Sequence, residues 1–202
     1  MYKVEPLSYA YSALEPYIDT RTVGIHYNNH YMGYLKKLNT LLEQQNYNFQ
    51  YPLKELPSHI DTFPIDARGD ILYNAGGVLN HELYFKNISP NKNTIPKGKL
   101  KEAIDNQYGS FENFKKEFIR NANLVVGSGY TFLVVNNNEL QIMNTSNQET
   151  PYTYNMIPIM TIDLWEHAYY LEYQSNKAAY IHNFFEIIDF DVVNSLYENA
   201  LQ

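Results

Sequence analysis

The sequence contains a carboxylate and an imidazole at a spacing that could serve a metal ion. Asp163 and His167 stand four residues apart within an aromatic-rich segment, residues 163–170. A carboxylate oxygen and an imidazole nitrogen held close together suit a first-row transition metal better than calcium or magnesium. The same pair could form a surface ion pair, but His26 and His81 lie in two further aromatic-rich segments. Three imidazoles and one carboxylate are therefore available for one site.

His26, His30 and Tyr34 recur at every fourth residue of one expected helix. Each step of four turns the side-chain direction by about 40° and advances about 6 Å along the helix axis. One ion is therefore not held as easily by both histidines as by one of them. The alternatives are a buried, hydrogen-bonded core histidine for His26 and ordinary aromatic packing for His30 and Tyr34.

The elements that must carry these residues follow from the hydrophobic periodicity. Apolar residues at helical spacing predict a helix over residues 20–43, capped by Asp19 or Thr20, and a second helix over residues 67–87. Prolines break the chain between them. The two helices are predicted to form an antiparallel helical hairpin.

A polar, turn-rich segment over residues 89–98 predicts a domain boundary. We therefore expect an N-terminal helical hairpin domain over residues 1–90 and a C-terminal domain over residues 91–202. The first would supply two histidine ligands, and the second would supply the aspartate and the third histidine.

The second half of the chain mixes helical and strand periodicity. Runs of β-branched and aromatic residues predict three strands, the first two joined by a turn of three asparagines. The expected strands are residues 129–135, 140–145 and 157–162, and the expected helices are residues 99–107, 110–123, 177–186 and 189–200. The predicted class is α+β: a helical hairpin followed by a small three-stranded antiparallel sheet flanked by helices.

Composition excludes several classes of function. Hydrophobic residues form 45% of the 202 positions, which excludes a disordered chain, and the net charge of -7 argues against nucleic acid as a partner. The absence of cysteine excludes disulfides and thiolate ligands. No apolar run reaches the length of a membrane span, and the first residues lack the apolar region of a signal peptide. We expect a cytoplasmic protein with no membrane partner.

Taken together, these segments resemble the iron/manganese superoxide dismutase family. The similarity covers nearly the whole chain, and its motifs occur in order: Leu14-Glu15-Pro16-Tyr17-Ile18-Asp19, His26-x-x-x-His30, Asn80-His81-x-x-Tyr84-Phe85, Gly127-Ser128-Gly129, Asn147-Gln148 and residues 163–170. The resemblance implies that one manganese or iron ion per subunit converts superoxide to oxygen and hydrogen peroxide. It also implies the ligand set His26, His81, Asp163 and His167.

The resemblance implies roles for residues around the ligands. Tyr34 and Gln148 would tune the metal and relay protons, and His30 would help at the entrance to the site. Iron-type members of the family carry glutamine at the position of Gly77, whereas manganese-type members have glycine there and supply the glutamine from the hairpin. Gly77 with Gln148 therefore favours manganese, or a pattern that tolerates both metals.

A pocket wall and a subunit contact complete the implied site. Trp165 matches the family's aromatic wall, whereas Tyr130 and Phe132 stand where the family usually has two tryptophans. The resemblance also places Glu166 and Tyr170 in the contact between two subunits of a homodimer, or of a dimer of dimers.

Two other functions compete with this interpretation. A non-catalytic metal-binding or structural relative with the same fold is supported by the replacements at Tyr130 and Phe132. A hydrolytic metalloenzyme has less support, because a general base beside an open metal position is needed and no His-Glu-x-x-His motif occurs. His59 and His182 lack partners at metal-ligand spacing and are expected to be surface or packing residues.

Overall fold

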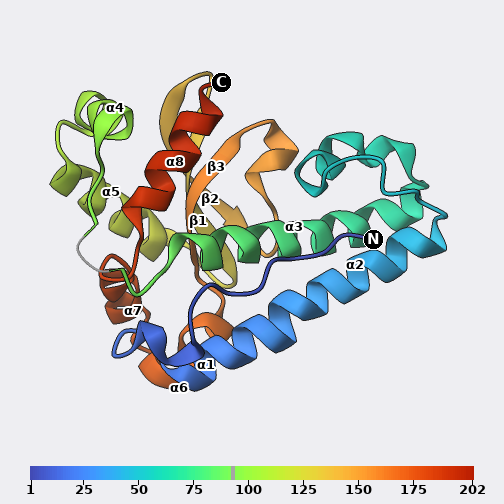
Figure 1. The fold of residues 1–202 in the computed structure, drawn as a ribbon, viewed down its shortest axis with the longest axis horizontal. Helices are drawn as coiled ribbons and strands as arrows, with labels where there is room; N and C mark the ends of the chain where they lie inside the picture. The colour runs from blue at the N-terminus through green and yellow to red at the C-terminus, as the bar shows by residue number, and fades with distance from the viewer. Residues whose placement is uncertain (92–93) are drawn as a thin grey trace.

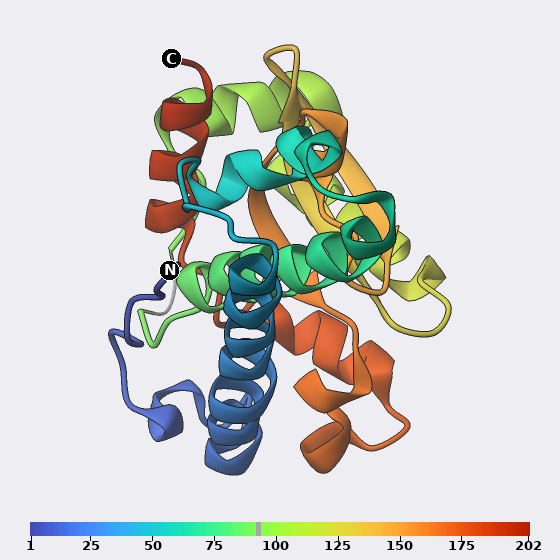
Figure 2. The ribbon, with the colours of Figure 1, turned by 90° about the vertical axis from the view of Figure 1, so that its right-hand side faces the viewer.

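The computed structural model describes residues 1–91 and 94–202, and its N-terminal helices are followed by a small sheet with helices around it (Figure 1). Two long helices dominate the first half, α2 (Met32–Gln44) and α3 (Ile65–Asn87). They run in opposite directions and pack against each other (Figure 1), and Figure 2 shows the molecule turned by 90°. The predicted helical hairpin is therefore confirmed. The connection, where prolines were expected to break the chain, contains 3₁₀ turns over Leu53–Thr62.

The helix predicted over residues 20–43 is interrupted where it carries its histidines. It begins as α1 (Thr20–Ile25), whose first turn is capped by Oδ1 of Asp19 accepting from the backbone N–H of Thr22 at 2.9 Å. A π-helical segment, His26–Tyr31, then joins α1 to α2, and the N–H of Met32 donates to the carbonyl five residues earlier. The prediction of one regular helix was wrong at this point. Such wide turns inside α-helices often occur at functional sites.

The second half holds a three-stranded antiparallel sheet in the order β2-β1-β3. Its strands are β1 (Gly129–Asn136), β2 (Glu139–Ser146) and β3 (Ile157–Asp163). The central strand β1 is buried at every residue but its last, so helices cover both of its faces. Asn137 and Asn138 form the predicted turn between β1 and β2 with φ of 50° and 65°, a backbone conformation that asparagine tolerates.

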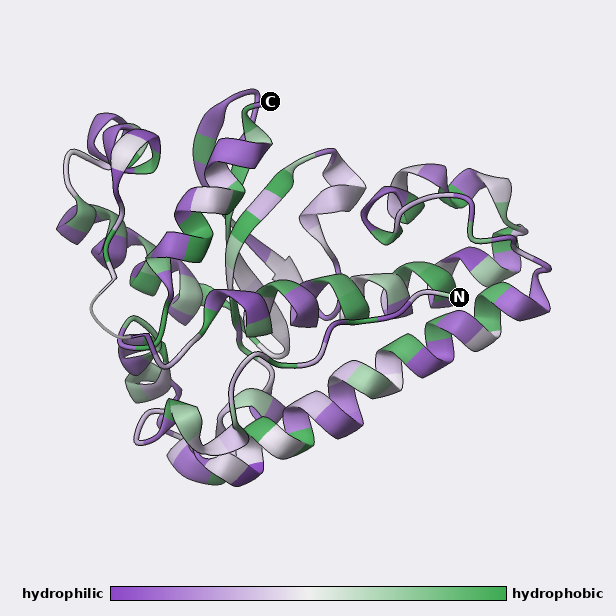
Figure 3. Cartoon of the chain, in the orientation of Figure 1, coloured by the Kyte–Doolittle hydropathy of each residue, from purple (hydrophilic) through white to green (hydrophobic). Residues whose placement is uncertain are grey.

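Helices surround this sheet, and most of them match the predicted ranges to within one or two residues. They are α4 (Gly98–Tyr108), α5 (Phe111–Leu124), α6 (Tyr170–Tyr173), α7 (Lys177–Phe184) and α8 (Phe190–Ala200). The sheet contacts α3, α5 and α8 directly. Hydrophobic and hydrophilic bands alternate along α2 and α8 (Figure 3), as expected of helices with one buried face. The short helix α6 was not predicted.

Asn87, the last residue of α3, ties the helical hairpin to the sheet. Its side-chain amide donates to the carbonyl of Ile159 at 3.2 Å and accepts from the backbone N–H of Thr161 at 3.0 Å. These contacts satisfy β3 where its pairing with β1 shifts register. The helix that carries His81 is therefore fixed to the strand that ends at Asp163.

The boundary predicted at residues 89–98 includes Lys92 and Asn93, which lie outside the described residues. The division of the chain into two domains after residue 90 stays a prediction.

Candidate metal centre

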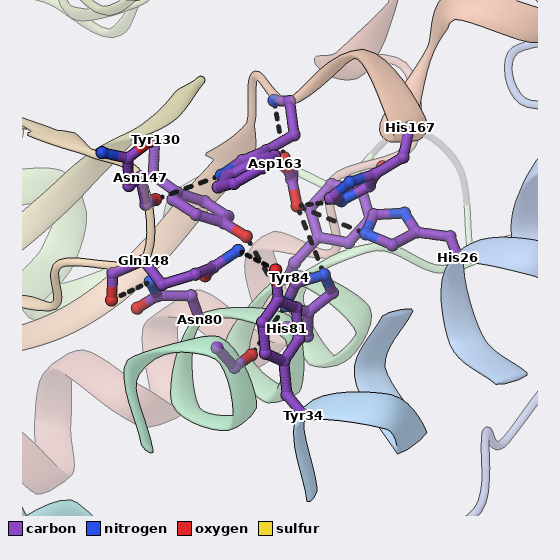
Figure 4. A network of polar contacts seen from close by, with 12 residues as sticks. His26, Tyr34, Asn80, His81, Tyr84, Tyr130, Asn147, Gln148, Asp163 and His167 are labelled. Atoms are coloured by element: carbon purple, nitrogen blue, oxygen red, sulfur yellow. Dashed lines mark hydrogen bonds and ion pairs between the residues drawn. The ribbon is translucent and has the colours of Figure 1, made fainter. Parts of the chain in front are cut away.

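Four elements bring the predicted ligands to one point (Figure 4). His26 comes from the π-helical segment, His81 from the middle of α3, Asp163 from the end of β3, and His167 from a 3₁₀ turn, Glu166–Ala168. The Asp163 Oδ2 atom lies 3.2 Å, 3.7 Å and 3.3 Å from the Nε2 atoms of His26, His81 and His167. One ligand atom from each of the four lies within 4.8 Å of every other.

The donor set fits a cation. Nε2 of His26 and Nε2 of His81 are buried and have no hydrogen-bond partner among the described residues. The His26 nitrogen is near the Asp163 carboxylate but is not aligned for a hydrogen bond with it. Leaving a buried polar atom unsatisfied costs about 1–3 kcal/mol, a cost that a bound cation removes. Three imidazole nitrogens and one carboxylate oxygen suit manganese or iron.

The His81 ring is oriented so that its Nε2 is free to bind a metal ion. Its Nδ1 lies 2.6 Å from the carbonyl oxygen of Gly77, one turn earlier in α3. Because a carbonyl can only accept, Nδ1 carries the hydrogen, and Nε2 presents its lone pair to the cluster. Such a backbone partner fixes both the tautomer and the ring orientation of a metal-binding histidine.

The electrostatics of the cluster favour a cation. Burial lowers the pKa of His26 to about 4 and holds the pKa of His81 well below its usual range, so both rings are neutral at pH 7. Burial alone would raise the pKa of Asp163, but the charge and hydrogen bond of His167 and the electrostatic interaction with His26 outweigh it and lower that pKa. A buried carboxylate therefore stays ionised beside the neutral rings of His26 and His81, and its negative charge calls for a counter-ion.

Residues outside the ligand set fix Asp163 in place. Its Oδ1 accepts from the backbone N–H of Trp165 at 2.8 Å, and its main-chain carbonyl accepts from the hydroxyl of Tyr180 at 2.9 Å. Tyr180 was not predicted. It lies in α7, and its sequence context has no spacing or composition that links it to a metal ligand.

Gln148 lies beside the cluster in the tight turn that follows β2, and it is buried. Its side-chain amide donates to the hydroxyl of Tyr34 at 3.1 Å, so the two residues predicted to act together are in contact. Asn80, another residue that was not predicted as part of the site, donates to Oε1 of Gln148 at 3.4 Å and to the carbonyl of Glu149 at 3.2 Å.

The paired glycines in α3 make room for these residues. A Cβ on Gly76 would lie 1.9 Å from the main-chain oxygen of Gln148, and a Cβ on Gly77 would lie 2.5 Å from the Tyr34 ring. Neither distance is possible for real atoms, so a side chain at either position would displace the turn or the ring. Gly77 therefore lies against Tyr34, as a wall residue would.

Tyr130 and Phe132 stand where the family usually has two tryptophans. Among the described residues, only Tyr130 of these two makes a polar contact with a predicted metal ligand. Both are completely buried in β1, with ring centroids 5.8 Å apart. The Tyr130 hydroxyl lies 3.5 Å from Nδ1 of His81. Phe132 packs behind it with Leu83 and Val134 in an apolar cluster.

Two aromatic rings flank His167. The ring of His30 stacks on it with centroids 4.0 Å apart, and the indole of Trp165 lies 5.5 Å away at an interplanar angle of 24°. The indole N–H donates to the carbonyl of Asn147 at 3.1 Å, which ties this wall to the turn that carries Gln148. Burial lowers the pKa of His30 to about 4.

Glu166 and Tyr170 are exposed rather than turned toward the cluster. They line a hollow together with Trp165, His167 and Lys177. His59 and His182 lie away from the metal centre, and His59 stacks on Tyr51 with ring centroids 3.7 Å apart.

The fold and the site define a protein with a buried cluster of three histidines and one aspartate that could hold one metal ion. Two family models match the chain, the alpha-hairpin domain of iron/manganese superoxide dismutases over residues 1–89 and their C-terminal domain over residues 96–196. The chain belongs to the iron/manganese superoxide dismutase family. Superoxide dismutation, the reaction of this family, is therefore its activity.

Similar proteins share the full length of the chain. It is 38% identical to the proteins named superoxide dismutase [Mn] from Listeria innocua and Listeria monocytogenes, and 40% identical to superoxide dismutase [Mn/Fe] 2 from Staphylococcus aureus. Each comparison covers 98% of both chains. Within the described residues, no helix combines the length and the apolar character needed to cross a bilayer.

Proposed function

We propose that His26, His81, Asp163 and His167 hold one manganese or iron ion, with manganese favoured, and that superoxide reacts there. The bound ion supplies two oxidation states, so that one superoxide is oxidised to oxygen and the next is reduced to hydrogen peroxide. One ligand atom from each of these four residues lies within 4.8 Å of every other, and this observation carries the proposal. Two of the histidines in the group have a buried Nε2 without a hydrogen-bond partner among the described residues. The glycine at position 77 and the contact between Gln148 and Tyr34 support manganese.

Tyr34 and Gln148 are proposed to supply and position protons. Tyr34 accepts from the Gln148 amide, so its own O–H remains available to donate. Burial and a hydrogen bond with Tyr73 raise the pKa of Tyr34, which keeps the phenol protonated at neutral pH. Tyr73 is 42% exposed and connects this phenol to solvent. Reduction of superoxide to peroxide consumes two protons, and this pair of tyrosines gives them a route.

His30 and Trp165 are proposed to hold His167 and to restrict access. The His167 ring has His30 on one side and is close to the Trp165 indole, so its orientation is set by packing as well as by Asp163. His30 is partly exposed, which supports a position at the entrance to the cluster. Tyr130 and Phe132 line or back the wall on the side of the sheet.

We propose a homodimer, or a dimer of dimers, whose contact includes Glu166 and Tyr170. Both side chains are exposed next to the ligand His167. Large apolar side chains are exposed in the same half of the chain: Leu124, Val126 and Leu171, with Val126 at 95%. We also propose a cytoplasmic location for the protein, which cell fractionation would test.

The ligand assignment is tested by His81→Ala, with His59→Ala as a matched control. Both variants remove one imidazole, but only His81 belongs to the cluster. His81→Ala is expected to lose the bound metal and dismutase activity, and His59→Ala to keep both. If His81→Ala retained its metal and its activity, the ligand set would be wrong. If every variant and the natural protein bound metal without dismutating superoxide, a non-catalytic relative would be the better description.

A further inference from the structure

Tyr84 and Tyr180 form a pair of buried phenols behind the metal centre. Tyr84 lies in α3, in the turn that follows His81, and Tyr180 lies in α7. Both residues are 1% exposed, and their hydroxyl oxygens are 3.1 Å apart. A buried hydroxyl is costly unless it is hydrogen-bonded, so the direction of these bonds decides what the pair can hold in place.

The hydrogen bonds of this pair run in one direction. The Tyr180 hydroxyl donates to the main-chain carbonyl of Asp163 at 2.9 Å, and a carbonyl oxygen can only accept. Because a phenol has a single hydrogen, Tyr180 has none left to donate to Tyr84. The Tyr84 hydroxyl is therefore the donor in the contact between the two phenols. The chain runs from Tyr84 through Tyr180 to Asp163, and each bond in such a chain strengthens the next.

The rings of the same two residues contact further segments that carry ligands. The Tyr84 ring lies beside the ligands (Figure 4), and its centroid is 5.1 Å from that of the His26 ring. The Tyr180 ring stacks on Tyr169 with centroids 5.2 Å apart and an interplanar angle of 20°. Tyr169 follows the 3₁₀ turn that carries His167. The pair therefore packs against two ligand segments besides the end of β3.

The carboxylate of Asp163 follows the position of its main chain closely, because a single methylene group separates the two. Its Oδ2 lies within 3.7 Å of the Nε2 atoms of all three histidines in the cluster. The Oδ1 atom is held by the backbone N–H of Trp165 at 2.8 Å. Tyr180 holds the main-chain carbonyl of the same residue, so Asp163 is fixed at both its side chain and its backbone.

We propose that Tyr84 and Tyr180 are positioning residues that hold Asp163 at the metal centre through this one-way chain of two hydroxyls. Tyr180 acts directly on the main chain of Asp163, and Tyr84 acts through Tyr180. The inference rests on the proposed role of Asp163 as a metal ligand.

The chain is tested first in the metal-free protein by the NMR chemical shift of the Asp163 carbonyl carbon, which reports the hydrogen bond that this carbonyl accepts. Tyr180→Phe keeps the ring and removes the donor, so the resonance should move upfield. Tyr84→Phe should move it less in the same direction, because the bond to the carbonyl remains but loses its support. In the double variant the shift should equal that of Tyr180→Phe alone. Tyr197→Phe, which removes a buried phenol in α8, should leave the resonance unchanged.

Two results of this measurement would overturn the proposal. One is a carbonyl shift in Tyr180→Phe that is no larger than the shift in Tyr197→Phe. The other is a Tyr84→Phe shift that is absent, or that adds in full to the shift of Tyr180→Phe in the double variant. If Tyr180→Phe does not fold, Tyr84→Phe decides alone, because its hydroxyl can reach the carbonyl only through Tyr180.

The consequence for the metal is tested with Mn²⁺, by its dissociation constant in competition with a chelator and by the electron paramagnetic resonance spectrum of the bound ion. Tyr180→Phe should weaken binding about tenfold, as the loss of a group that orients a ligand does, and should alter the spectrum. The spectrum reports ligand geometry, which a loss of stability alone does not change. Tyr197→Phe should change neither property.

Unchanged affinity and an unchanged spectrum in Tyr180→Phe would contradict the positioning role. A natural chain that bound no metal would instead refute the proposed function and leave the NMR result on Asp163 standing.

Discussion

His26 shows how a single side chain is prepared for a cation at the residue scale. It is buried beside Asp163, His81 and His167, and burial lowers its pKa to about 4. A histidine kept neutral presents a lone pair without competition from a proton. Because the folded protein keeps His26 neutral, the metal-free protein should be sensitive to acid.

We predict that the metal-free protein loses stability as the pH falls from about 6.5 to about 4. Across this window the unfolded chain binds a proton at His26 and the folded chain does not, so the free energy of unfolding decreases with decreasing pH. The groups that face His26 are Asp163, His30, His81 and His167. The difference between folded and unfolded pKa corresponds to about 3 kcal/mol for full protonation.

Urea unfolding at pH 7 and at pH 4.5 measures this loss. His26→Asn should reduce the dependence on pH and leave the part that comes from His30 and His81, whose pKa values are also lowered. His182→Asn, which changes an exposed histidine in α7, should leave the whole dependence intact. An unfolding free energy that is the same at both pH values in the natural protein would contradict the argument. Below pH 4 a further loss is expected, because the lowered pKa of Asp163 contributes stability only while that carboxyl is ionised.

At the scale of elements, the close approach of α3 to the turn after β2 positions Gln148. Gly76 permits this approach, because any Cβ there would lie 1.9 Å from a main-chain oxygen. Gly76→Ala should therefore lower the free energy of unfolding by at least about 2 kcal/mol, as overpacking against backbone does.

Gly69 provides a control in the same helix, since a Cβ added there meets nothing within 4 Å. Gly69→Ala should raise stability by up to about 1 kcal/mol through helix propensity alone. Chemical unfolding of the two variants measures both effects. A Gly76→Ala protein as stable as Gly69→Ala would show that the turn does not depend on this glycine.

The sequence predicted most elements, because their periodicities are clear and the turn residues are distinctive. The turn at Asn137 and Asn138 and the cap at Asp19 occupy the predicted positions. The π-helical segment His26–Tyr31 was missed. The apolar spacing of one turn does not show whether a backbone N–H donates to the carbonyl four residues earlier or to the one five residues earlier. Tertiary contacts select the wider turn, and they cannot be inferred from local pattern.

The metal ligands could be predicted only by combining distant segments. Residue type and spacing indicated the pair Asp163 and His167, and family resemblance added His26 and His81. Asn80 and Tyr180 were missed because their partners are distant in the sequence. Asn80 donates to the side-chain amide oxygen of Gln148 and to the carbonyl of Glu149, and Tyr180 donates to the carbonyl of Asp163.

At the scale of the whole molecule, each half of the chain supplies part of the cluster. Asn87 fixes α3 to β3, so the distance between His81 and Asp163 depends on the packing of the two halves. Metal binding should therefore stabilise the folded state, because the unfolded chain cannot bring the four ligands together.

The proposed subunit contact gives a second prediction at this scale. Glu166→Ala should shift the protein from dimer toward monomer and lower its metal retention, because the exposed carboxylate adjoins the ligand His167. Glu102→Ala removes an exposed carboxylate in α4 and should change neither property. Sedimentation velocity with elemental analysis of the same samples measures both. A natural protein that sediments as a monomer, or a Glu166→Ala dimer with full metal content, would refute the assignment.

The most direct measurement of the central claim is elemental analysis of the purified protein, combined with superoxide dismutation by the same sample before and after removal of its metal. The structure predicts one manganese or iron ion per chain, with manganese favoured, and activity that disappears with the metal and returns when it is restored. A protein that binds no metal after reconstitution, or that dismutates superoxide equally well without it, would contradict the assignment of the cluster.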